Sequence, residues 1–146
     1  MLGAHWIKGW STTQAVIATS SREAEYYGMV RAASLGMGLL AVMEDSNLGK
    51  NLAKSGRIRI NTDASAAKGI AGRMGLGKVR HLEVSQLWLQ QKVMEGEVTT
   101  KKVSGGENLA DALTKHVGKE ILENHVAGTG GRIQEGRHEL MPTVGS

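Results

Sequence analysis

Cysteine and phenylalanine are absent from this chain of 146 residues, and proline occurs only once. Without cysteine there is no disulfide scaffold, no thiolate zinc site and no cysteine nucleophile, which fits a reducing compartment. The longest strictly apolar run, residues 39–43, is far too short to cross a bilayer, and the first ten residues lack the apolar stretch of a signal peptide. We therefore expect a soluble, unsecreted chain with no membrane partner, long enough for one domain.

The charge of the chain is unevenly distributed. The formal net charge is +4, but residues 50–80 contain eight basic residues and a single acid, Asp63, which makes this stretch +7. Such a stretch suits a polyanion such as a nucleic acid, although an ordinary solvated basic face has the same composition. Aspartate is scarce, with Asp45, Asp63 and Asp111 as its only occurrences.

Hydrophobic periodicity predicts strands that alternate with helices. Two short strands are expected within residues 5–18. The S-x-x-E pattern of Ser20 and Glu23 predicts a capping box at the start of a helix over 22–44, and we expect Glu23 to be a cap rather than a ligand. Further strands are expected at 57–62 and 97–103, and further helices at 64–74, 81–94, 109–117 and 121–126. This order is typical of an α/β domain with a partly parallel sheet, here over residues 1–126. Residues 127–146 are glycine-rich and aperiodic, and we expect them to form a loose tail.

Three carboxylates lie where α/β sheets usually bind ligands, near the carboxyl ends of strands. Asp63 ends one predicted strand, Asp111 follows the last strand and its glycine turn, and Glu25 lies in the first turns of the long helix. Converging carboxylates need a divalent cation, and magnesium prefers such oxygen ligands. With a phosphodiester substrate, two such metals can activate a water and stabilise the leaving oxygen. Taken singly, Glu25 and Asp111 could also be solvated helical acids, and Asp63 could be an N-cap.

Five short segments have the residue patterns and the order that are typical of one known family. They are Trp10-Ser11 with Gln14, Ser20 to Tyr26, Asp63 with Ala66 and Ala67, Arg80-His81-Leu82, and Ala110-Asp111 with Thr114-Lys115. Over roughly residues 5–118 the chain thus resembles the ribonuclease H domain of Ty1/copia-type retrotransposon Pol polyproteins. The resemblance implies a ribonuclease H-like mixed sheet flanked by helices. It also implies that Glu25, Asp63 and Asp111 are ligands of two magnesium ions, with manganese as an alternative.

The same resemblance implies a function and partners. The intact polyprotein would hydrolyse the RNA strand of an RNA–DNA hybrid and leave a 3′-hydroxyl, beside the reverse transcriptase part of the same polyprotein. Lys78, Arg80 and His81 are the expected nucleic-acid contacts, with Lys115 as a weaker candidate, because hybrids are read by shape through phosphate and 2′-hydroxyl groups. The expected location is a retroelement particle in the cytoplasm, or the nucleus.

One departure from the family concerns catalysis. The family carries its first metal-binding aspartate on a strand before the WSxxQ segment, and no residue of this chain corresponds to it. We therefore expect the first strand and part of the second to be missing, and the chain to be inactive or nearly so by itself. Two alternatives stay open: a non-catalytic basic nucleic-acid-binding remnant, and an open reading frame fragment that does not fold alone.

Overall fold

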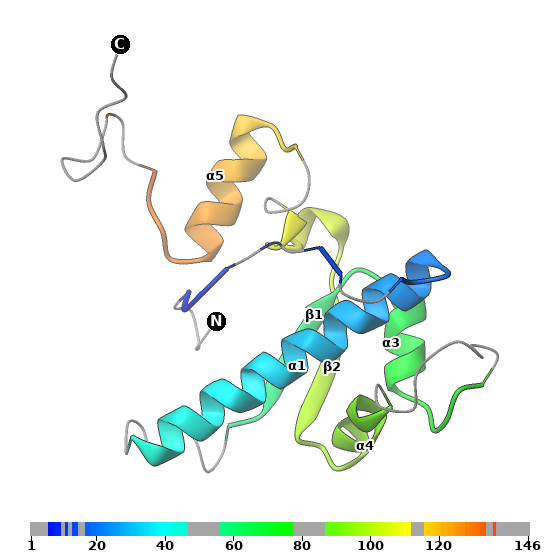
Figure 1. The fold of residues 1–146 in the computed structure, drawn as a ribbon. Helices are drawn as coiled ribbons and strands as arrows, with labels where there is room; N and C mark the ends of the chain where they lie inside the picture. Colours follow the sequence, from blue (N-terminus) through cyan, green and yellow to red (C-terminus); the bar gives the residue numbers. More distant parts are fainter. Residues whose placement is uncertain are drawn as a thin grey trace. The chain divides into compact units, whose positions relative to one another are not determined.

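The computed structural model describes residues 6–9, 11, 13–14, 17–46, 56–77, 87–111, 116–133 and 136 (Figure 1). The chain divides into two compact units, residues 12–108 and the terminal segments 1–11 with 109–146. The first unit contains helix α1 (Ser21–Asp45), strand β1 (Ile58–Thr62), helices α3 (Ser65–Ala71) and α4 (Trp88–Met94), strand β2 (Val98–Lys102) and the short 3-10 helix η2 (Gly105–Glu107). The second contains helix α5 (Lys119–Gly128). The chain is thus of the mixed α/β class, as the alternating pattern predicts.

Helix α1 begins where the capping-box pattern predicts. Ser20 is the N-cap, and its Oγ accepts a hydrogen bond from the Glu23 backbone N–H at 3.3 Å. In a standard capping box the Glu23 carboxylate would accept from the N–H of the N-cap, Ser20. Here its Oε2 accepts instead from the residue before the N-cap, from the N–H and the hydroxyl of Thr19 at 2.8 and 2.6 Å. These bonds satisfy donors at the start of the helix. The expectation that Glu23 has a capping role is confirmed.

Strands β1 and β2 form a parallel pair with Ile58 opposite Val98 and Thr62 opposite Lys102. The Ile58 N–H donates to the Glu97 carbonyl at 3.1 Å before the pair, and the Val103 N–H donates to the Thr62 carbonyl at 3.0 Å after it. A parallel pair requires a long crossover, and helices α3 and α4 lie within that crossover. Both strands therefore end on the same side of the sheet.

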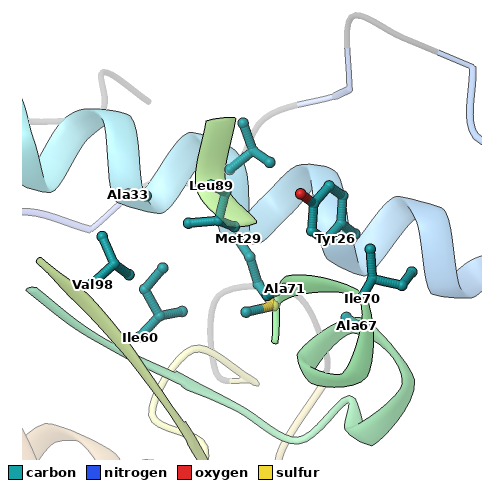
Figure 2. Packing of buried hydrophobic residues seen from close by; sticks show 10 residues of the cluster. Tyr26, Met29, Ala33, Ile60, Ala67, Ile70, Ala71, Leu89 and Val98 are labelled. Carbon is teal, nitrogen blue, oxygen red and sulfur yellow. The ribbon is translucent and has the colours of Figure 1, made fainter. Parts of the chain in front are cut away.

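The core of the first unit forms between α1 and one face of this sheet. Tyr26, Met29 and Ala33 recur at helical spacing and are at most 3% exposed. Figure 2 shows them among Ile60 and Val98 of the strands and the small residues of α3, with Leu89 of α4 completing the cluster. Because α3 presents only Ala67, Ile70 and Ala71 to this core, the helices can approach closely.

Helix α1 is also the one helix of the described residues that is long and apolar enough to cross a membrane by length and composition alone. A core helix satisfies the same criterion. In this structure the buried side of α1 packs against β1 and α3.

Several predicted boundaries differ from the structure. Residues 6–9 and 17–18, which fall in the two strands expected near the N-terminus, lie in no strand, and the rest of those stretches lies outside the described residues. Helix α3 ends at Ala71 rather than near residue 74, because Gly72 follows as its C-cap. Only the last part of the helix expected over 81–94 is described, as α4. Of the helix expected over 109–117, residues 109–111 and 116–117 lie in no α-helix, and residues 112–115 are outside the description. Helix α5 begins at Lys119 and continues to Gly128, into the segment expected to be a tail.

Candidate functional site

Asp63 lies at the carboxyl end of β1, in the first unit. It is half-buried and lines a hollow of about 640 Å³ together with Lys102, Val103, Ser104 and Gly105. All of these residues come from the segments that directly follow β1 or end β2, so the parallel pairing is what brings them together. Ligands of α/β sheets bind at this kind of edge.

The Asp63 carboxylate is not used in the turn into α3. The Thr62 hydroxyl accepts the Ala64 N–H at 3.1 Å, and the N-cap of α3 is Ala64, which has no side chain to cap with. The alternative that Asp63 is an N-cap is therefore wrong. Among the described residues, no hydrogen-bond donor or cation contacts the Asp63 side chain. A half-buried carboxylate without a partner is available to a ligand.

The other side of the hollow is built by the end of β2 and the turn after it. The Glu107 carboxylate accepts from the Ser104 hydroxyl at 3.0 Å and from the Ser104 N–H at 3.4 Å, which closes a capping box around η2. The Ser104 side chain is thereby held within its own turn. Lys102 is exposed and has no acidic partner among the described residues, so the hollow contains one free anion and one free cation.

The other two predicted carboxylates have different surroundings. Glu25 belongs to the same unit as Asp63 and is exposed in the first turns of α1. Asp111 belongs to the second unit, where it is half-buried and engaged in an interaction. Over the described ranges, no three histidine, aspartate or glutamate side chains are grouped so that they could hold a metal ion. Asp63 suits a metal ligand, but the described residues do not supply a complete ligand set.

The predicted nucleic-acid contacts Lys78, Arg80, His81 and Lys115 lie outside the described residues. Lys102 was not among the predicted site residues. Its signal in the sequence is its place near the end of the alternating stretch 97–103, shortly before the glycine turn. This position assigns Lys102 to the same site as Asp63 only once β2 is known to run parallel to β1.

Comparisons with protein-family models, with curated proteins and with solved structures gave no match for this chain.

Proposed function

We propose that this chain is a ribonuclease H-type nuclease module, which in the intact polyprotein hydrolyses the RNA strand of RNA–DNA hybrids with magnesium. The observation that carries the proposal is Asp63, a half-buried carboxylate without a described partner at the carboxyl end of a parallel strand. The resemblance of residues 5–118 to the ribonuclease H domain of copia-type polyproteins supplies the substrate class. It also adds the ribonuclease H-like sheet and the roles of Glu25 and Asp111 as further metal ligands.

The residues of the hollow have distinct roles in this proposal. The Asp63 carboxylate would hold a magnesium ion through an oxygen ligand, the donor type that magnesium prefers. Magnesium, when bound, supplies Lewis-acid stabilisation of phosphate oxygens and an activated water. Lys102 would attract the phosphate by charge, since this residue lines the same hollow. Because the described residues contain no complete ligand set, the proposal extends to metal binding at Asp63 and not to a catalytic step at the metal.

Metal binding is the direct test, because it does not depend on turnover. Manganese binding to the purified chain is measured by paramagnetic resonance for the wild type, Asp63→Asn and the control Asp45→Asn, whose aspartate ends α1. Loss of a direct ligand should weaken the affinity by at least roughly tenfold in Asp63→Asn and leave it unchanged in the control. Equal affinity in all three proteins would overturn the proposal.

Cleavage is followed in the same samples with a hybrid labelled on its RNA strand. Slight magnesium-dependent cleavage at most is expected, because the described residues contain no complete set of metal ligands. Any activity that is present should disappear in Asp63→Asn and persist in Asp45→Asn. Activity that survives Asp63→Asn would count against the proposed role of Asp63.

A second candidate function is nucleic-acid binding without catalysis. It is favoured by four exposed basic side chains on or directly before the two strands, Arg57, Arg59, Lys101 and Lys102, which have no acidic partner among the described residues. Hybrid affinity that falls steeply with salt and does not respond to magnesium, without metal binding at Asp63, would support this function over the nuclease.

A further inference from the structure

The two-stranded sheet has a second face, opposite the core. Side chains along a strand alternate between faces, and Ile60 and Thr62 of β1 are buried on the core side. The side chains that alternate with the buried ones, Arg59 and Asn61 of β1 and Thr99 and Lys101 of β2, are exposed, and they are adjacent because Arg59 is opposite Thr99 and Asn61 is opposite Lys101. We call these four residues the polar sheet face. A parallel sheet is usually covered on both faces, so an exposed polar face on this one is unusual.

The polar sheet face carries positive charge that is not neutralised. Neither Arg59 nor Lys101 forms an ion pair with any described residue, and Arg57, two residues before Arg59, is also exposed and unpaired. The acid that precedes β2, Glu97, is bound to the Lys92 ammonium at 2.9 Å. The excess charge on this face is therefore cationic.

The uncharged members of the face suit a phosphate and sugar partner. Asn61 carries amide donors, and the Thr99 hydroxyl donates to the Ile58 carbonyl at 3.3 Å, which leaves its oxygen free to accept. The face contains no aromatic side chain on which a base could stack. Arginine, lysine, threonine and asparagine are the side chains that commonly contact nucleic-acid backbones.

We propose that the polar sheet face binds the sugar–phosphate backbone of a nucleic acid without reading its sequence. The ladder between β1 and β2 fixes the spacing of the two cations, so they are held in place before the ligand arrives. The proposal rests on the proposed function for the choice of an RNA–DNA hybrid as ligand, but it does not depend on metal binding or cleavage.

The test compares two double variants that remove the same charge. Arg59→Gln/Lys101→Gln changes the polar sheet face, and Arg31→Gln/Lys119→Gln removes exposed cations from α1 and α5. Binding of two fluorescent RNA–DNA hybrids of unrelated base sequence is measured by anisotropy without divalent metal between about 50 and 200 mM salt. Far-UV circular dichroism verifies that each variant is folded.

Removal of two phosphate contacts should lower the slope of log K against log salt by about 2, regardless of base sequence. The control pair should change the slope by much less. Equal effects of the two pairs would overturn the proposal, since the attraction would then be due to net charge alone. A difference between the pairs that is seen only with one base sequence would also overturn it. Binding to the polar sheet face is measured without divalent metal, whereas the nuclease proposal is tested by metal binding at Asp63, so failure of the nuclease proposal and failure of this one are distinguishable.

Discussion

The side-chain amide of Gln90 pairs with the backbone of Gly75 through two hydrogen bonds. Gln90 Oε1 accepts the Gly75 N–H at 2.7 Å, and Gln90 Nε2 donates to the Gly75 carbonyl at 3.0 Å. Nε2 also donates to the Ile70 carbonyl at 2.9 Å, at the end of α3. Gln90 is 4% exposed, so this one side chain joins α4 to the end of α3 and to the loop that leads toward Lys78.

Gln90→Ala should therefore lower the free energy of unfolding by about 2–4 kcal/mol, because three backbone groups lose a partner in one buried and two part-buried hydrogen bonds. The neighbouring Gln91→Ala is the matched control. Gln91 is exposed and bonds only Glu95 at 2.7 Å among the described residues, and its loss should cost no more than about 0.5 kcal/mol. Urea unfolding followed by circular dichroism measures both values. Equal losses in the two variants would contradict the anchoring role of Gln90.

Thr62→Val should destabilise the protein by about 1–3 kcal/mol, since the Ala64 N–H would lose its acceptor where the chain leaves β1. Thr62 is 6% exposed, and valine keeps its shape. Thr99→Val is the control on the exposed face, and it should cost less because water can replace its bond to Ile58. The same urea unfolding measurement compares the two variants. A larger loss of stability in Thr99→Val than in Thr62→Val would contradict a stabilising role of the Thr62 turn.

Asp63→Asn should leave the free energy of unfolding within about 0.5 kcal/mol of the wild type, because no described residue forms a hydrogen bond or ion pair with the carboxylate. An N-cap role would instead predict a loss of about 1 kcal/mol on replacement by alanine. Asp63→Ala, measured by urea unfolding, separates these cases. A loss of that size in Asp63→Ala would show that the carboxylate has a structural role after all.

Stability should also decline at alkaline pH through Tyr26. Burial raises the pKa of the Tyr26 hydroxyl from 10.0 to about 12, against a smaller opposite effect of Arg73. The folded state then holds this proton more tightly than the unfolded state. The contribution of Tyr26 to the free energy of unfolding is therefore complete below pH 10 and is lost as the pH rises toward about 12. Tyr26→Phe should flatten this decline, whereas Tyr27→Phe should retain it. Unfolding free energies measured across this pH range would contradict the prediction if Tyr26→Phe declined like the wild type.

Local patterns in the sequence predicted much of the fold correctly. The capping residues at Ser20 and Glu23 and the spacing of Tyr26, Met29 and Ala33 were sufficient to predict α1, because caps and helical periodicity act within a few residues. The alternation along residues 57–62 and 97–103 likewise predicted β1 and β2. The short segments near the N-terminus were predicted less well, since a few alternating residues without a defined partner do not specify a strand.

The sequence by itself determined which residues could carry the chemistry, namely a few carboxylates in a basic chain, and where α1 and β1, which position Glu25 and Asp63, would begin. Only the tertiary structure decided that β1 and β2 pair in parallel, and this pairing places Lys102 beside Asp63 and Arg59 near Lys101. It also decided that Thr62, rather than the adjacent Asp63, makes the hydrogen bond of the turn. The physical reason is that strand partners and register depend on packing between segments far apart in the chain, whereas periodicity and caps depend on neighbours.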